Sequence, residues 1–377
     1  MSVVWYRYPP RTRTSSGLKE GGEIMKTLHV GDLHLREGEM RFTVKMQDNN
    51  EVMLSNLVKE VEEDEEIGLV VLGGDIQDKT PSDIKEVAMW RKYFRKLGQI
   101  MQRRINLNAI MFVGLDAETM QGLKDGTVLP LVACRGNHDH EKVLRNEETE
   151  YTFFDELLRE GLIINPKGVA FKEGGKKHYI DIRNYGQADR KLPKTVTDNR
   201  EDWFVMAVFH DNVLMPESPL WLLKSKGKEG VYNAEEVMKD VDVGFLNHIH
   251  EKVDPIFIEK EDGKTGVLWQ YGSMGRTSLK PENVRDVGYC ALFDTNNPTE
   301  FGSVEIDVIP AQEYFSFEKA MRVKQREKDY KDFSLQMDTV ERTSEDPCEV
   351  IQNLENVEDE VKAFCVEILQ QVQAGSR

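Results

Sequence analysis

Aspartate, asparagine and histidine gather in five short clusters along the chain, and these residues are the best suited to chemistry. Five of the eight histidines lie in such clusters, and His140 directly follows one of them. Carboxylate oxygens, amide carbonyls and imidazole nitrogens bind divalent cations, and histidine also transfers protons near neutral pH. The clusters therefore predict a metal site, with Asp75 placed to bridge two ions. The candidate residues are Asp32, His34, Asp75, Asp78, Asn137, His138, Asp139, His210, His248 and His250.

One such cluster would be weak support, because an isolated histidine is more often a structural residue than a ligand. We interpret His29 and His178 as structural histidines of this kind. Five clusters in sequence, each directly after a predicted strand, are hard to obtain by chance. Sites in open α/β sheets form at the carboxyl ends of strands. The combination therefore favours metal binding.

Short hydrophobic runs precede the clusters and must position them. They predict strands over residues 26–30, 68–72, 129–133, 204–209, 243–246, 267–271 and 289–293. Apolar residues that recur every three or four positions predict an amphipathic helix over residues 82–104, with Ser82 as its N-cap. Alternating strands and helices are typical of an α/β fold in which helices pack on a sheet.

Composition limits the function classes. The formal net charge of −17 repels nucleic acid and anionic membranes over most of the surface, so an anionic substrate would need local basic patches or bound cations. The sequence has neither an apolar run long enough to span a membrane nor a secretory signal, and we expect a cytoplasmic protein without membrane association. Its four cysteines form no C-x-x-C pair, which argues against a thiolate zinc site.

The chain is predicted to have three parts. Residues 1–24 form a flexible N-terminal extension, and Met25 is a candidate natural start. Residues 25–310 form the catalytic domain. Residues 311–377 form a smaller C-terminal region for capping or partner binding, in which an apolar stripe over residues 350–368 predicts a terminal helix. Packing of this helix on its own domain is favoured over docking on a partner helix.

The order of the clusters resembles the calcineurin-like metallophosphoesterases, whose motifs read D-x-H, G-D-x-x-D, G-N-H-D/E, H and G-H-x-H. The resemblance covers residues 26–294 and implies a β-sandwich flanked by helices. It also implies that His138 is the catalytic histidine, oriented by Asp78 or Asp139. The implied ligands are Asp32, His34, Asp75 and His250 for one metal, and Asp75, Asn137, His210 and His248 for the other.

Two departures from the family pattern concern access to the site. Asn247 stands where the last motif has glycine. Asp75 and Asn137 are 62 positions apart, which predicts an insertion over residues 105–127. Neither departure removes a ligand. The ligand set suits two divalent ions such as Mn²⁺, Fe²⁺, Zn²⁺ or Mg²⁺, and the resemblance favours Mn²⁺.

A closer resemblance concerns the segments after the last motif. Residues 270–278 and 286–290 resemble the SbcD-type DNA repair nucleases, in which a Gly-Ser-x-x-Arg segment precedes a Val-Gly-Tyr strand. This resemblance implies manganese-dependent exonuclease and endonuclease activity in DNA repair or recombination. It also implies a homodimer and an SbcC-type coiled-coil ATPase as partner. Basic residues on the helix over 82–104 could contact a phosphate backbone, although a solvated helix face explains them equally well.

Two alternatives remain open. The same scaffold could serve a small-molecule phosphatase or a cyclic-nucleotide phosphodiesterase, with the insertion as a lid over the site. A protein that kept the fold and lost the chemistry ranks lower, because every expected ligand position is filled.

Overall fold

The computed structural model describes residues 26–36, 43–78, 84–140, 152–173, 175–215, 230–276, 283–297 and 301–319, with single residues or pairs between and beyond these ranges. The predicted extension over residues 1–24, Met25 and the N-cap Ser82 lie outside the described residues. So does most of the predicted terminal helix over residues 350–368.

The first sheet has five strands in the order β16-β15-β1-β2-β4. Strands β1, β2 and β4 run parallel, whereas β15 is antiparallel to β1 and β16 to β15. The carboxyl ends of β1, β2 and β4 therefore meet at one edge. The bounds are β1 Lys26–Val30, β2 Ile67–Leu72, β4 Val132–Ala133, β15 Val287–Asp294 and β16 Phe301–Asp307.

The second sheet has seven strands in the order β13-β14-β12-β9-β8-β7-β3. Its central strands β8, β9, β12 and β14 are parallel to one another, so their carboxyl ends also share an edge. The bounds are β3 Ile110–Val113, β7 Gly168–Glu173, β8 Lys176–Arg183, β9 Trp203–His210, β12 Val243–Asn247, β13 Ile256–Glu259 and β14 Thr265–Gln270.

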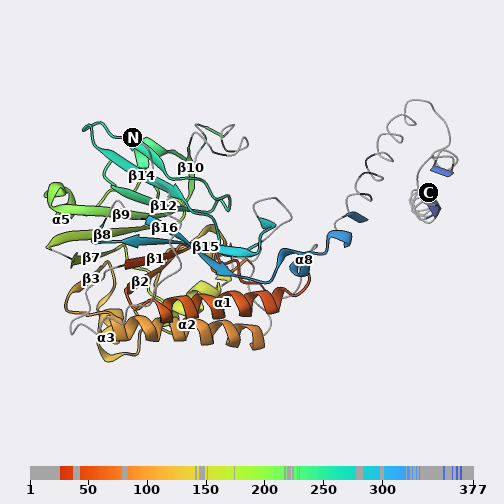
Figure 1. Cartoon of the computed structure of the whole chain (residues 1–377), viewed down its shortest axis with the longest axis horizontal. Coiled ribbons are helices and arrows are strands. Elements are labelled where there is room, and N and C mark those ends of the chain that lie inside the picture. The colour runs from red at the N-terminus through yellow and green to blue at the C-terminus, as the bar shows by residue number, and fades with distance from the viewer. Residues whose placement is uncertain are drawn as a thin grey trace. The chain divides into compact units, whose positions relative to one another are not determined.

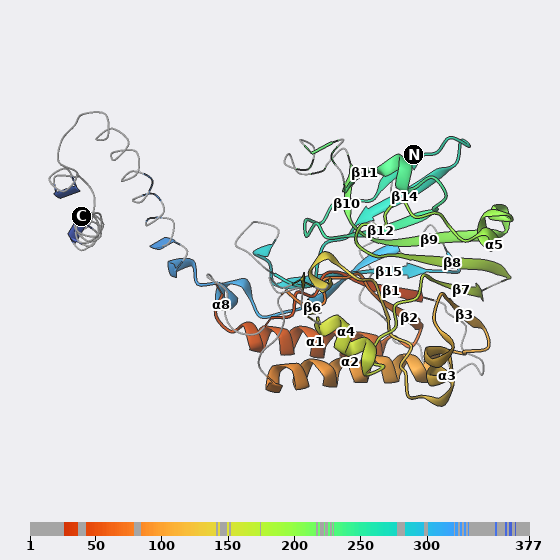
Figure 2. The ribbon, with the colours of Figure 1, turned by 180° about the vertical axis from the view of Figure 1, so that it is seen from behind.

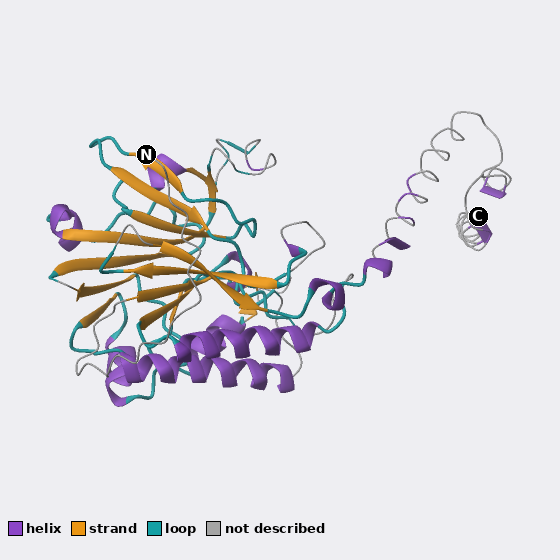
Figure 3. Cartoon of the chain, in the orientation of Figure 1, coloured by secondary structure: helices purple, strands orange, loops and turns teal. Residues whose placement is uncertain are grey.

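The two sheets pack face to face through aromatic side chains. Phe293 of β15 stacks on Phe204 of β9 with ring centroids 5.7 Å apart, and it meets Phe245 of β12 edge-on at 6.1 Å. All three strands also contribute to one hydrophobic core. The layered arrangement confirms the predicted β-sandwich flanked by helices (Figures 1 and 3).

Helices cover the outer faces of the sheets. Helices α1 (Met46–Glu63) and α2 (Ile84–Arg104) lie side by side under the first sheet, while the short helices α5 (Lys194–Thr197) and α7 (Ala234–Val237) accompany the second (Figures 1 and 2). The apolar stripe of α2 is buried in the core of its own chain.

Shorter elements complete the described chain. Their bounds are α3 Ala117–Asp125, η1 Asn137–Asp139, β5 Lys142–Val143, β6 Thr149–Glu150, α4 Phe153–Arg159, η2 Arg200–Asp202, β10 Asn212–Leu214, β11 Val231–Asn233 and α8 Ala311–Tyr314.

The predicted insertion over residues 105–127 forms β3 and α3. Strand β3 pairs antiparallel with β7 at the edge of the seven-stranded sheet, and Phe112 and Leu123 are buried in the main core. These residues are therefore an integral part of the sandwich. We found no support for the alternative in which they form a separate lid.

The predicted strands are confirmed, with one shorter than expected. Of residues 129–133 only Val132 and Ala133 pair with β2, because Leu129 and Leu131 bond instead to the chain after α4. Strands β3, β7, β8, β13 and β16 were not predicted. A second compact unit comprises residues 41–43 and 315–377 and is described at few positions.

Candidate metal centre

The five clusters lie at the carboxyl ends of strands, as predicted. Asp32 and His34 follow β1, and Asp75 follows β2. In the second sheet His210 ends β9 and pairs in register with Asn247, the last residue of β12. Because both sheets turn the carboxyl ends of these strands to the same region, residues more than 200 positions apart come into contact.

Three of the candidate ligands have left-handed backbone conformations. The φ angles are 46° at His34, 44° at Asp75 and 84° at His248, and Lys45 is the other non-glycine residue with positive φ among those described. Such conformations are costly for residues with a Cβ atom, and they persist where the surrounding structure enforces them, often at functional sites. The backbone strain thus falls on the candidate site.

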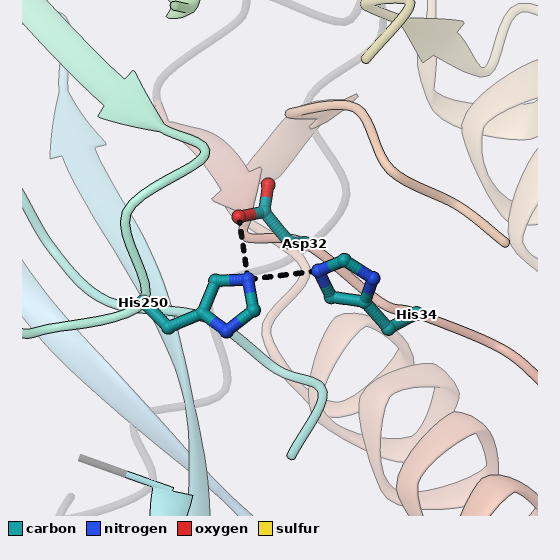
Figure 4. Close-up of side chains that lie close together, drawn as sticks. All are labelled: Asp32, His34 and His250. Atoms are coloured by element: carbon teal, nitrogen blue, oxygen red, sulfur yellow. Dashed lines mark hydrogen bonds and ion pairs between the residues drawn. The ribbon is translucent and has the colours of Figure 1, made fainter. Parts of the chain in front are cut away.

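The first group of ligand atoms consists of Asp32, His34 and His250 (Figure 4). His250 Nε2 lies 2.8 Å from His34 Nε2 and 3.6 Å from Asp32 Oδ2. Burial lowers the pKa of His34 to about 3 and that of His250 to about 4. Both imidazoles are therefore neutral at pH 7, and neutral imidazole is the form that binds metal ions.

The second group consists of Asp75, Asn137, His210 and His248. His210 Nε2 lies 3.2 Å from both Asp75 Oδ2 and Asn137 Oδ1, and His248 Nδ1 lies 2.8 Å from Asn137 Oδ1. Burial lowers the pKa of His248 to about 4. Four oxygen and nitrogen donors, from the ends of β2, β9 and β12 and from η1, thus converge.

Asp75 lies between the two groups. Its Oδ2 atom is 3.2 Å from His210 Nε2 and 3.8 Å from His34 Nε2. Gly136 makes this position possible, since a Cβ atom on it would come within 2.2 Å of Asp75 Oδ1. One carboxylate therefore faces both groups, the arrangement expected of a bridging ligand.

The histidine at the centre of the second group has a fixed ring orientation. His210 Nδ1 donates a hydrogen bond to the carbonyl oxygen of Gly73 at 2.9 Å, which leaves Nε2 pointing at Asp75 and Asn137. A backbone acceptor behind the ring is the usual support of a metal-binding histidine. Burial alone would lower the pKa of His210, but the carboxylates of Asp75 and Asp32 outweigh it and raise the pKa to about 10.

The buried carboxylates need positive charge nearby. Burial and the neighbouring Asp75 raise the pKa of Asp32 to about 7, although His210 opposes the shift. Burial would also raise the pKa of Asp75, but His210 and His34 outweigh it and hold this pKa below its usual range. Asp32 Oδ1 is buried and makes no hydrogen bond within the described chain. A bound cation would satisfy this oxygen and the crowded charge, so the donor set fits divalent metal ions.

His138 lies beside both groups and is the accessible histidine among them. Its side chain is 36% exposed, and its Nδ1 lies 3.1 Å from the carbonyl oxygen of Asp78 and 3.6 Å from Asp78 Oδ1. Its backbone N–H donates to Asp75 Oδ1 at 2.8 Å. The imidazole is thus held by Asp78 and anchored to the candidate bridge, with one ring nitrogen left for a substrate.

Asp139 has different partners. Its carboxylate is fully buried and accepts hydrogen bonds from the backbone N–H groups of Ile76, Gln77 and Gly136. Burial, with Asp75 adding to it, raises the pKa of Asp139 to about 7. Of the two residues proposed to orient His138, the structure brings only Asp78 to its imidazole within the described chain, whereas Asp139 joins the second and third clusters.

Asn247, the departure from the family motif, is a structural residue. It is buried, donates to the carbonyl oxygen of Phe209 at 3.1 Å and accepts from the hydroxyl of Tyr271 at 2.6 Å. The absence of a side chain at Gly73 leaves room for it, because a Cβ atom there would lie 2.2 Å from Asn247 Oδ1. The departure therefore braces the strand end behind His210 and leaves the ligands in place.

The segment that carries the SbcD-type resemblance supports the first cluster. The backbone N–H groups of Met274 and Gly275 donate to the carbonyl oxygen of Asp32 at 3.1 and 2.7 Å. Arg276 is buried, with its guanidinium 4.1 Å from the ring of Tyr314 and bonded to the carbonyl of Arg285. Its role in the described chain is thus to anchor this segment. Thr277 and Ser278 lie outside the described residues.

The two histidines interpreted as structural are buried away from the ligand groups. His29 stacks on Phe245 at 3.8 Å and contacts Thr27 Oγ1, and burial lowers its pKa to about 3. His178 stacks on Phe171, and burial lowers its pKa to about 4. Both fit the structural interpretation.

Two residues near the centre, Asp211 and Tyr185, were not predicted from the sequence. Asp211 follows His210 and accepts hydrogen bonds from the backbone N–H groups of Gly186 and Gln187. Tyr185, in that same loop after β8, has its ring 5.8 Å from that of His248. Their positions just beyond strand ends were the available signal, but neither residue belongs to a metal-binding pattern.

Fold and site together define a metallophosphoesterase, and comparison with known proteins agrees. The family described as calcineurin-like phosphoesterase matches residues 25–252, and the chain belongs to that family. It is accordingly a metal-dependent phosphoester hydrolase whose family binds two divalent ions. No helix within the described residues is long and apolar enough to cross a membrane.

Comparison with individual proteins gives no assignment finer than the family. None of the curated proteins matches the chain. Among solved structures, a hypothetical protein from Thermus thermophilus is 10% identical, with a TM-score of 0.36 over 75% of this chain and 100% of that one.

Proposed function

We propose that the chain is a metal-dependent nuclease of the SbcD type that hydrolyses phosphodiester bonds in DNA. The observation that carries the proposal is the position of residues 270–276, the SbcD-like segment. The backbone of this segment donates hydrogen bonds to Asp32 of the candidate metal centre. A segment in that position shapes the first ligand group. Its resemblance to the nuclease subgroup therefore concerns the site itself, not a distant surface.

The chain's own residues divide the chemistry between them. Two divalent ions, when bound, lower the pKa of a water molecule and neutralise charge on phosphoryl oxygens. The two ligand groups would hold the cations, and Asp75, which faces both groups, would be the ligand that they share. His138, oriented by Asp78, donates a proton to the oxygen that leaves phosphorus as the new bond from water forms. Manganese is the proposed metal.

A small diester is the second candidate substrate, and the charge distribution favours it. The net charge of −17 opposes a polyanion. Three of the basic residues on α2 that could contact a phosphate backbone are already engaged. Arg91 pairs with Glu156 and Glu160, Lys96 pairs with Glu62, and Arg104 donates to backbone carbonyls. A small-molecule phosphatase or a cyclic-nucleotide phosphodiesterase would use the same centre.

Hydrolysis assays on two substrates distinguish the nuclease from the small-molecule enzyme. The full chain with Mn²⁺ is assayed on linear duplex DNA and on bis-p-nitrophenyl phosphate, with Asp75→Asn as the matched control for contaminating enzymes. Cleavage of both substrates, lost in the control, supports the nuclease. Hydrolysis of the small ester alone would favour the second candidate. Absence of both activities in metal-loaded protein would support the inactive scaffold.

The proposed assembly is a homodimer bound to an SbcC-type coiled-coil ATPase. It rests on the resemblance, since most of the predicted terminal helix over residues 350–368 lies outside the described residues. Truncation at Thr343 tests the partner site: loss of ATPase binding with diester hydrolysis retained would support it, and undiminished binding would refute it.

A further inference from the structure

A tyrosine stands at the edge of the second ligand group without a part in metal binding. The ring of Tyr185 lies 5.8 Å from that of His248 and 6.0 Å from that of His140, which is exposed. Tyr185 itself is partly exposed. One aromatic face thus borders the centre on the side of Asn137 and His248, next to a second ring that reaches solvent.

The backbone of Tyr185 is tied to both ligand-bearing segments. Its N–H donates to the carbonyl oxygen of Arg135, two residues before Asn137, at 2.9 Å. The N–H of Arg135 donates in turn to Asn184 Oδ1 at 2.8 Å. On the other side, the N–H groups of Gly186 and Gln187 donate to Asp211, the residue after His210, at 2.8 and 3.1 Å.

These bonds fix the tyrosine relative to the ligands. A ring held on such a loop loses little conformational entropy when another ring packs on it. Nucleobases stack on aromatic side chains in this way irrespective of sequence, because every base has a π face. A nucleoside joined to a phosphate that reacts beside Asn137 can bring its base to this ring.

We propose that Tyr185 is a specificity-determining residue that stacks on an unpaired nucleobase next to the reacting phosphate. The inference rests on the proposed phosphodiesterase function and narrows its substrate class to nucleotide diesters whose flanking base is out of a duplex. His140, beside the tyrosine, extends the same aromatic surface towards solvent. Diesters without a base bind the metal centre but lose this contact.

The test compares two esters with the same leaving group. These are thymidine 5′-(p-nitrophenyl phosphate) and methyl p-nitrophenyl phosphate, and the readout is the ratio of their kcat/KM values with Mn²⁺. In Tyr185→Leu the ratio should fall about 5- to 150-fold, the range of base–aromatic stacking. Tyr185→Phe keeps the ring and should keep the ratio. An unchanged ratio in Tyr185→Leu overturns the inference.

A second variant gives a readout that does not depend on turnover. In Tyr185→Trp, thymidine 5′-monophosphate should quench the added tryptophan emission, whereas methyl phosphate should not. Equal responses to the two ligands would contradict stacking. If the unaltered protein hydrolyses neither ester, the proposed function fails, which is a different result from hydrolysis of both esters with no dependence on Tyr185.

Discussion

Replacing His138 with alanine should slow hydrolysis of a diester with an alkoxide leaving group by about 10²- to 10⁴-fold, the usual contribution of a positioned general acid. The imidazole is held 3.1 Å from the carbonyl oxygen of Asp78 and stays 36% exposed, so it is both oriented and open to a substrate. Alanine keeps the backbone N–H that donates to Asp75 at 2.8 Å. The metal ligands should therefore remain in place.

The choice of ester makes the prediction sharp. p-Nitrophenolate leaves phosphorus without a proton, whereas an alkoxide needs one. The His138→Ala protein should thus lose its rate on thymidylyl thymidine and keep most of it on methyl p-nitrophenyl phosphate, with bound metal measured by mass spectrometry as the control. Asp78→Ala should give a smaller loss of about 10- to 100-fold, as expected for a supporting residue. Equal slowing of both esters at unchanged metal content would refute the role of His138 as acid.

Three further predictions concern the metal centre and its support. Asp75→Asn should lower metal content at both positions, because one carboxylate faces both ligand groups; after dialysis against Mn²⁺, retention of two ions per chain would contradict the bridge. Asp139→Ala should destabilise the fold by roughly 2 to 5 kcal/mol in urea unfolding. The buried N–H groups of Ile76, Gln77 and Gly136 lose their acceptor, which costs about 1–3 kcal/mol each before partial relaxation of the backbone. A change in the free energy of unfolding below about 1 kcal/mol would contradict this supporting role of Asp139. For His29, the pKa is about 3 in the folded chain and 6.5 in the unfolded chain, so the unfolded state binds the proton first and stability is lost as pH falls from 6.5 towards 3. In His29→Phe, measured with a metal chelator present, the pH dependence of the free energy of unfolding should decrease by up to about 1.4 kcal/mol per pH unit. If the unaltered protein and the variant had parallel profiles of stability against pH, the lowered pKa of His29 would be wrong.

Much of the fold could be predicted because local pattern and tertiary structure agree. The hydrophobic runs before Asp32, Asp75 and His210 became strands β1, β2 and β9, and the helix predicted over residues 82–104 is α2, described from Ile84 to Arg104. Strands β7 and β8 were missed, since lysines at their ends obscure the hydrophobic pattern that burial in the sheet later reveals. The spacing between Asp75 and Asn137 predicted extra chain over residues 105–127, but only the packing showed that β3 within it extends the seven-stranded sheet.

The amino-acid sequence by itself determined which chemical groups are present and that each follows a strand, because side-chain type and hydrophobic periodicity are local properties. Only the tertiary structure decided which groups meet. The parallel register of β9 with β12 brings His210 beside Asn247, and the facing sheets carry His250 to His34 across 216 positions. The tertiary structure also brought Asp78 to His138 but Asp139 to the backbone of Ile76, and it placed Tyr185 next to His248. Such contacts depend on how sheets and loops pack, which no short stretch of sequence encodes.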